Sequence, residues 1–190
     1  MQLIVDRGEA ALDSLPRGLR ENREAMAETI ENNVRRLIID ETGVNPKYYE
    51  KMSELLDGLI LQRKQGAMDY KAYLARIVEF AKKVGKPESQ SSYPSSINSA
   101  ALRALFDNLE RAEVSVAGES RPHHGYSPSV HKRMEKAIAL DRAIRGVKKA
   151  DWRGNRFKER EVRNAIKSTL GDDDGLVESI FEIVKNQREY

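Results

Sequence analysis

Apolar residues recur at every third or fourth position through most of the chain. In the first such stretch, Met26, Ile30, Val34 and Ile38 share this spacing, with mainly polar residues between them. The spacing places the apolar side chains on one face of an α-helix and the polar side chains on the other. The pattern predicts helices over residues 20–41, 46–65, 70–84, 98–109, 128–145, 157–170 and 175–186.

Two stretches interrupt the helical pattern. Residues 87–97 are rich in Ser and Pro, which is typical of a linker. Residues 113–127 contain two glycines, a proline and a pair of histidines, which indicates a long irregular loop. No set of strands is indicated. The expected fold class is therefore all-α, a multi-helix bundle of roughly seven to eight amphipathic helices with one long irregular loop.

The stripes also predict how the helices are grouped. Residues 21–86 hold three helices joined by short turns, which should pack antiparallel because none can bury its apolar stripe alone. Residues 98–190 form a second helical unit around the loop at 113–127. A chain of 190 residues can build one domain with a sizeable core or two small ones, and we expect the two units to pack as one domain.

Particular side chains carry further expectations. Aromatic residues bury large areas, so Tyr49 and Tyr73 on two apolar stripes, and the single tryptophan, Trp152, are candidate structural anchors. Leu55 and Leu56 are both expected on the apolar stripe of the second helix, and Asp174 is expected to cap the last helix.

Composition narrows the classes of protein. Of the 190 residues, 39% are apolar and 33% are charged, as in globular rather than disordered chains, and a net charge of +3 does not by itself indicate a nucleic-acid binder. The absence of cysteine excludes disulfides, thiolate metal sites and a cysteine nucleophile. No signal peptide and no apolar run of about 18 residues is present. We expect a cytoplasmic protein without membrane contact.

Positive charge is concentrated in one part of the chain. Residues 131–167 hold thirteen Lys and Arg against five Asp and Glu. Within this part, the segment DWRGNRFKEREVRNAI, residues 151–166, has a Trp-containing turn followed by a basic helix. Arg153, Lys158, Arg160 and Arg163 are candidates for contact with DNA phosphates or with a protein partner. Glu159 interrupts the positive run, so the solvated face of a structural helix is an equally open interpretation.

Motifs for catalysis are weak or missing. No GxxxxGK[ST] loop is present to bind a nucleotide. Asp69 and Lys71 have a spacing found in nucleases, but they open a predicted helix, which favours a capping role for Asp69. His123 and His124 are adjacent and His131 is seven residues further on, without a clear carboxylate partner. We therefore predict no catalytic, cofactor-binding or metal-binding residues in this chain.

Six blocks of the sequence, taken together, resemble the C-terminal region of the restriction subunit of type I restriction-modification enzymes. The resemblance spans nearly the whole chain, and six blocks in one order are more specific than a single short motif. The blocks are AETIENNVRRLIIDE (27–41), NPKYYEKMSELLDGLI (45–60), YKAYLARIVEFAKKV (70–84), YPSSINSAALRALFDNL (93–109), DWRGNRFKEREVRNAI (151–166) and IFEIVKNQREY (180–190).

The resemblance implies a role in a larger machine. Restriction subunits of this family carry a nuclease domain, two ATP-dependent motor domains that translocate DNA, and a helical C-terminal region associated with assembly onto the methyltransferase and specificity subunits. ATP and Mg²⁺ are expected only in upstream parts of a longer parent, an ATP-dependent type I site-specific deoxyribonuclease, and residues 1–20 are expected to be the exit from its second motor domain. The expected function is non-catalytic assembly with these subunits and packing on the motor domains; the alternative is an auxiliary module that binds duplex DNA.

Overall fold

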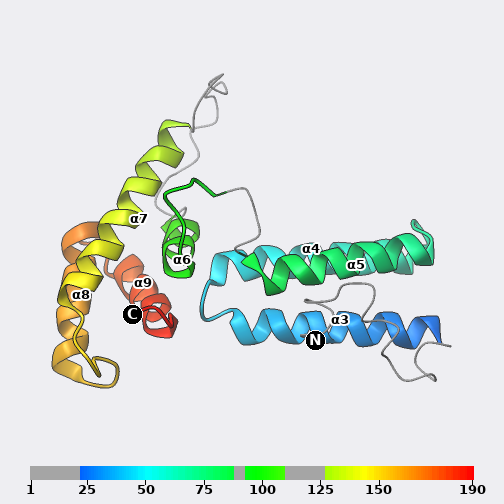
Figure 1. Ribbon diagram of the computed structural model, residues 1–190, viewed down its shortest axis with the longest axis horizontal. Helices are drawn as coiled ribbons and strands as arrows, with labels where there is room; N and C mark the ends of the chain where they lie inside the picture. Colours follow the sequence, from blue (N-terminus) through cyan, green and yellow to red (C-terminus); the bar gives the residue numbers. More distant parts are fainter. Residues whose placement is uncertain (1–21, 88–92, 110–126) are drawn as a thin grey trace. The chain divides into compact units, whose positions relative to one another are not determined.

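The computed structural model describes residues 22–87, 93–109 and 127–190. Within these ranges the chain forms seven α-helices and no strand (Figure 1), so the predicted all-α fold class is confirmed. None of these helices is both long enough and apolar enough to cross a membrane. The helices are α3 (Arg23–Glu41), α4 (Pro46–Lys64), α5 (Tyr70–Gly85), α6 (Ala100–Asn108), α7 (Pro128–Val147), α8 (Arg156–Leu170) and α9 (Asp174–Asn186).

Most helix ends lie within two residues of the predicted positions, because short polar side chains mark the starts. Asn22, Asp69, Ser99 and Ser127 each accept a hydrogen bond from a backbone N–H of the first turn. The predicted cap of the last helix is wrong by one residue: Asp173 accepts from Leu176 N, and Asp174 lies in the first turn. The predictions for residues 1–20 and for the loop at 113–126 lie outside the described residues.

Contacts between residues divide the chain into two compact units. The first unit contains α3, α5 and nearly all of α4. The second contains α6, α7, α8 and α9, together with the short segment Gly43–Lys47 that precedes and begins α4.

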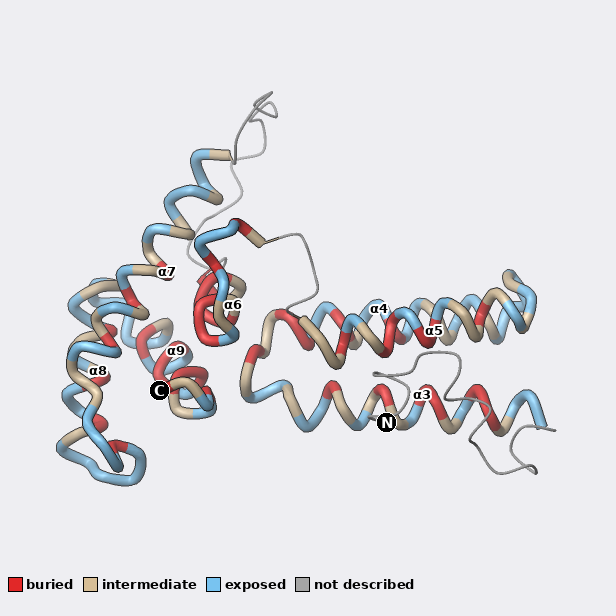
Figure 2. Tube along the Cα trace, in the orientation of Figure 1, coloured by how far each residue is buried: buried red, intermediate tan, exposed pale blue. Residues whose placement is uncertain are grey.

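In the first unit each helix reverses the direction of the one before (Figure 1), as the short turns predict. Buried residues lie on the sides of the three helices that face one another (Figure 2). Tyr49 and Tyr73 are both in this core, and Tyr48 packs edge to face on Tyr49. The prediction for Leu55 is wrong, because its side chain is 50% exposed, whereas the prediction for its neighbour Leu56 is confirmed, because Leu56 is fully buried. The core residues are Met26, Ala27, Ile30, Val34, Ile38, Tyr48, Tyr49, Met52, Leu56, Tyr73, Ile77, Val78, Phe80, Ala81 and Val84.

A charged cluster crosses the core of the first unit and contacts all three helices. Arg63 Nε of α4 donates to Glu31 Oε1 of α3 at 2.8 Å, and Tyr73 Oη of α5 donates to the same oxygen at 2.5 Å. The side chains of Arg63 and Glu31 are only 9% and 8% exposed. Arg63 also pairs with Glu24. Burial and the Glu31 carboxylate raise the pKa of Tyr73, so its hydroxyl remains the donor.

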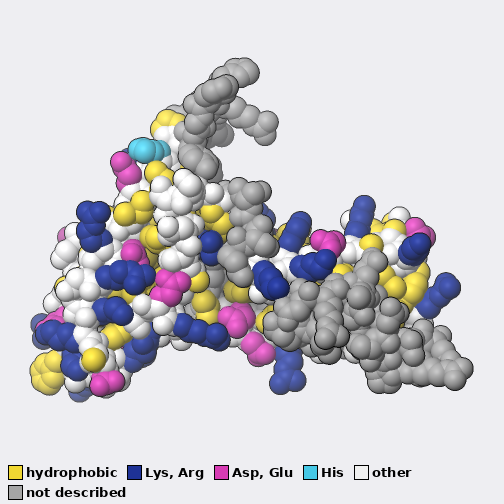
Figure 3. Space-filling view, viewed as in Figure 1, with side chains coloured by type: hydrophobic (Ala, Val, Ile, Leu, Met, Phe, Trp, Pro, Cys, Tyr) yellow, Lys and Arg dark blue, Asp and Glu magenta, His cyan; other side chains and the backbone are white. Residues whose placement is uncertain are grey.

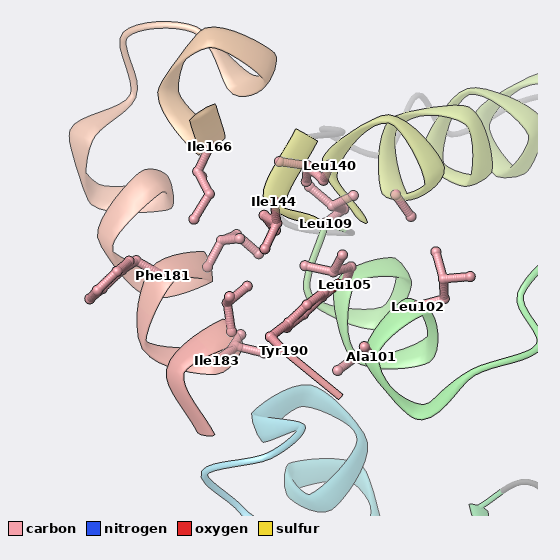
Figure 4. Close-up of a cluster of buried hydrophobic side chains, with 14 of the residues drawn as sticks. Ala101, Leu102, Leu105, Leu109, Leu140, Ile144, Ile166, Phe181, Ile183 and Tyr190 are labelled. Atoms are coloured by element: carbon pink, nitrogen blue, oxygen red, sulfur yellow. The ribbon is translucent and has the colours of Figure 1, made fainter. Parts of the chain in front are cut away.

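In the second unit the helices form a closed circuit: α6 packs on α7, α7 on α8, α8 on α9 and α9 on α6. Their apolar side chains meet at the centre of the circuit (Figure 4). The core is built from Ile97, Ala101, Leu102, Ala104, Leu105, Phe106, Leu109, Ala137, Leu140, Ile144, Trp152, Val162, Ile166, Val177, Ile180, Phe181, Ile183, Val184 and Tyr190. A closed circuit lets every helix bury one stripe without a sheet.

The segment Gly43–Lys47 is held in the second unit by side-chain amides. Asn45 Nδ2 donates to Asp107 Oδ2 at 2.7 Å, and Asn45 Oδ1 accepts from Asn108 Nδ2 at 2.8 Å. Gln187 Nε2, beyond the end of α9, donates to Val44 O at 2.5 Å. Asn45, Asn108 and Gln187 are all buried, so these bonds satisfy amide groups that would otherwise lose their water partners.

We expect Glu31→Ala to lower the free energy of unfolding by about 3 kcal/mol, because it leaves the Arg63 guanidinium buried without its main partner. The matched control is Asp57→Ala, which breaks an exposed pair with Arg35 and should change stability by less than about 0.5 kcal/mol. Urea unfolding followed by circular dichroism measures both. Equal losses in the two variants would show that the buried cluster does not hold the first unit together.

Candidate interaction surface

The candidate site is the turn between α7 and α8 with the helix that follows it. Asp151 and Gly154 both have positive φ, 53° and 79°. Gly154 adopts this conformation without the steric penalty of a Cβ, and Asp is among the side chains that tolerate it. Asn155 then caps α8 by accepting from Phe157 N at 3.2 Å and from Lys158 N at 3.3 Å. The Trp-Arg-Gly-Asn sequence thus directs the chain sharply into α8.

Trp152 lies in the core of the second unit, with 2% of its surface exposed. Its ring packs edge to face on Phe181 of α9, with the ring centres 6.0 Å apart. Arg153 places its guanidinium 4.9 Å from the centre of the Trp152 ring. The same guanidinium donates to Lys185 O at 2.7 Å and to Gln187 O. The turn therefore satisfies carbonyl groups at the C-terminal end of α9, where positive charge is also favoured by the helix dipole.

Two more of the predicted contact residues have partners within the second unit. Lys158 Nζ donates to Ala150 O at 2.6 Å. Arg163 makes a two-pronged ion pair with Glu178 at 2.9 and 3.0 Å, and its guanidinium lies 3.6 Å from the centre of the Phe181 ring. These contacts join α8 to α9 and to the turn before it. Lys158 and Arg163 were predicted to contact DNA or a partner, and the structure shows that both make contacts within the second unit.

Glu159 organises the charges around this turn. Its carboxylate is nearly buried and accepts from Gly154 N at 2.8 Å. Lys185 and Arg163 lie 3.4 and 3.6 Å away. The Gly154 N–H and these two cations lower the pKa of Glu159. The two-pronged pair with Arg163 likewise lowers the pKa of Glu178. Both carboxyl groups are consequently held in their ionised form by the fold.

The outward face of α8 has a different character. Arg156 and Arg160 are exposed, and neither has an ion-pair partner among the described residues. Between them Phe157 is 84% exposed. Phe157 is not among the predicted contact residues, although the sequence contains a signal for it. At about 100° per residue it lies almost opposite Val162 and Ile166, which form the buried face of the helix.

Cations continue onto the outer face of α7. Lys132, Lys136 and Arg142 have no ion-pair partner within the described parts of the chain. On the face drawn in Figure 3, Lys and Arg side chains gather over α7 and α8. We define the α8 face as Arg156, Phe157 and Arg160. It combines an exposed aromatic ring with two unpaired guanidinium groups, and can therefore bind an anionic group and an apolar group side by side.

Candidate metal ligands do not converge in the described residues: no group of three or more His, Asp or Glu is found there in a suitable arrangement. His131 is exposed and lies 3.3 Å from Glu135, one helical turn further along α7. His123 and His124 fall outside the described residues. The capping role predicted for Asp69 is confirmed, because Asp69 Oδ1 accepts from Lys71 N and Ala72 N.

We expect Arg153→Ala and Arg163→Ala each to lower the free energy of unfolding by about 1–2 kcal/mol, because each removes charged hydrogen bonds within the second unit. Arg160→Ala is the matched control, and its effect should stay below about 0.5 kcal/mol. Urea unfolding measures all three variants. An Arg160→Ala loss as large as the other two would contradict the assignment of Arg160 to the free surface.

Acid should destabilise the second unit through Glu159. Because folding lowers the pKa of Glu159 below its ordinary value of 4.5, its contribution is complete above that pH and disappears as the pH falls through the folded pKa. Glu159→Gln should therefore lower stability at pH 7 and flatten the decline in melting temperature below pH 4.5. An unchanged acid profile would show that Glu159 does not control it.

Comparisons with protein-family models, with curated proteins and with solved structures find no match to this chain. The likeness to type I restriction subunits therefore rests on the six sequence blocks alone.

Proposed function

We propose that this chain is a non-catalytic helical assembly module of a type I restriction subunit. In this proposal it joins the restriction subunit to the methyltransferase and specificity subunits and packs on its own upstream motor domains. The ATP-dependent cleavage of DNA belongs to other parts of the parent subunit. The six-block resemblance supplies the biological setting, and the α8 face supplies the contact surface.

The observation that carries the proposal is the exposure of Phe157. An aromatic side chain that is 84% exposed leaves a large apolar area in water, which a partner protein can cover. Aromatic residues and arginines are also the residue types enriched at the energetic centres of protein interfaces. Arg160 lies one helical turn from both Phe157 and Arg156, so the three exposed side chains can reach the same partner surface.

The surrounding charges favour binding over catalysis. Glu159 and Glu178 near the α8 face are ion-paired with Lys185 and Arg163. At the other end of α8, Lys167 lies 2.8 Å from Asp174, and this hydrogen bond raises the pKa of the lysine. These groups stay in their charged forms near neutral pH, where a general acid or base would need to exchange a proton. These ion pairs hold α8 in place and so fix the position from which Phe157 projects.

Contact with duplex DNA is the second candidate, and the outer face of α7 favours it. Lys132, Lys136 and Arg142 add three unpaired cations to the two arginines of the α8 face. Side chains of this kind neutralise phosphates without reading sequence. The two candidates differ in what Phe157 does: a protein partner buries its ring, whereas phosphate contacts along duplex DNA leave it in water.

The test is binding of the full chain to the methyltransferase and specificity complex of the same system, measured by titration calorimetry. We expect Phe157→Ser and Arg160→Glu each to weaken binding about tenfold or more, the effect of losing an interface hot spot. Leu61→Ser is the matched control, because Leu61 is an exposed apolar residue of α4, 54% exposed, and lies off the α8 face. Its affinity should equal that of the unmodified chain.

A second arm measures binding to a short random-sequence DNA duplex at low and high salt. The DNA-binding proposal would replace the assembly proposal if three results are found together. The chain does not bind the protein complex, its DNA affinity falls steeply with salt, and Lys132→Glu and Arg160→Glu abolish DNA binding. Phe157→Ser should leave such DNA binding unchanged.

A further inference from the structure

A groove runs between α4 and α5 in the first unit, far in sequence from the α8 face. Its volume is about 570 Å³, and its floor is mainly apolar. In α4 the positions Lys51, Leu55 and Leu59 follow one another at four-residue intervals, which places them in one row along the helix. The complete lining is Lys51, Met52, Leu55, Leu59, Ala75, Arg76, Glu79, Phe80 and Lys83.

Hydrogen bonds fix the two ends of the groove. At one end Tyr48 Oη of α4 donates to Lys83 O of α5 at 2.7 Å. At the other end Arg76 of α5 donates to Gln62 Oε1 of α4 at 3.4 Å. The two helices are therefore antiparallel along its whole length, with Leu55 between the two ends. Leu55 is 50% exposed, so the groove presents apolar surface that the first unit itself does not cover.

The rim of the groove is cationic. Lys51 and Lys83 lie at the end marked by the Tyr48 bond, and neither has an acidic partner among the residues the structure describes. Arg76 marks the opposite end, and it donates to the neutral side-chain amide of Gln62. Glu79 is the one acidic residue in the lining, and Lys82 neutralises it at 2.6 Å.

We propose that this groove binds an amphipathic helix of a partner protein, with apolar residues at intervals of three and four and with acidic residues on its flanks. An apolar channel parallel to two helices accepts the apolar stripe of a third helix. The cations at both ends and the neutralised Glu79 select carboxylates on that helix and repel basic sequences. Nucleic acid does not fit this site, because phosphates would have to lie over Met52, Leu55 and Phe80.

Placing this helix in the methyltransferase and specificity complex rests on the proposed assembly function. The groove's preference for an acidic amphipathic helix does not depend on that function, because it follows from Leu55 and the rim cations alone. Two experiments separate these claims.

The first experiment uses the full chain and two synthetic helical peptides as probes. Both peptides carry Leu at positions i, i+3, i+4 and i+7, and the remaining positions are mostly Glu in one and mostly Lys in the other. Fluorescence anisotropy should show binding of the Glu peptide at least tenfold tighter than that of the Lys peptide. Leu55→Asp should weaken binding of the Glu peptide at least tenfold, and Leu61→Asp, an exposed Leu outside the groove lining, should not. Equal binding of both peptides, or equal effects of both substitutions, would overturn the proposal.

The second experiment repeats the titration with the methyltransferase and specificity complex. Loss of affinity in Leu55→Asp, with normal affinity in Leu61→Asp, supports the groove as a second contact. Normal affinity in Leu55→Asp while Phe157→Ser weakens binding overturns the groove contact and leaves the assembly function standing. If the unmodified chain does not bind the complex but binds the Glu peptide through Leu55, the assembly function fails and the preference of the groove stands.

Self-association is checked in the same samples. Light scattering that shows a dimer of the unmodified chain and a monomer of Leu55→Asp would overturn the proposal, because a second copy would then occupy the groove. Leu55 is already half exposed, so Leu55→Asp should unfold at the same urea concentration as Leu61→Asp. If Leu55→Asp unfolds at a much lower urea concentration than Leu61→Asp, Leu55 is part of the hydrophobic core and the groove is not a binding site.

Discussion

The buried carboxylates and side-chain amides of each unit are paired, and these pairings decide how the helices are joined. In the first unit Glu31, Arg63 and Tyr73 come from three different helices and meet at one carboxylate. In the second unit the turn that carries Trp152 into the core also supplies Arg153, which satisfies carbonyl groups at the end of α9. Apolar stripes alone allow helices to slide and rotate against one another, whereas paired groups of this kind fix one register.

The same pairing decides which charges remain for binding. The basic segment 151–166 contains both bonded and unbonded cations, although composition makes them look equivalent. Arg153 and Arg163 are held by α9, because their guanidinium groups lie over Trp152 and Phe181 and within reach of acceptors. Arg160 is exposed and has no ion-pair partner among the described residues. The free surface is therefore smaller than the net charge of the segment suggests, and its centre is an aromatic ring.

Local signals explain why the helices and their starts could be predicted. An Asp before Tyr70, with a Gly at 85, defines α5 without information from the rest of the chain. It is harder to predict which of two adjacent apolar residues is buried. Adjacent residues differ by about 100° around a helix, and the spacing allows either of them to face inward. Leu55 and Leu56 show this: the first is half exposed and the second is fully buried. The acceptors of Arg153 could not be predicted, because they are backbone groups of a helix much later in the chain.

The α8 face and the groove of the first unit differ in shape and are alike in charge. The α8 face projects a single ring beside two arginines, whereas the groove of the first unit has Leu55 in its floor and lysines and an arginine on its rim. A partner that meets both needs an apolar pocket for one and an apolar ridge for the other, with carboxylates around each. Positive rims add more to association rate and to discrimination between partners than to affinity. The apolar centres, Phe157 and Leu55, must then supply most of the binding energy, since water leaves their surfaces when a partner covers them.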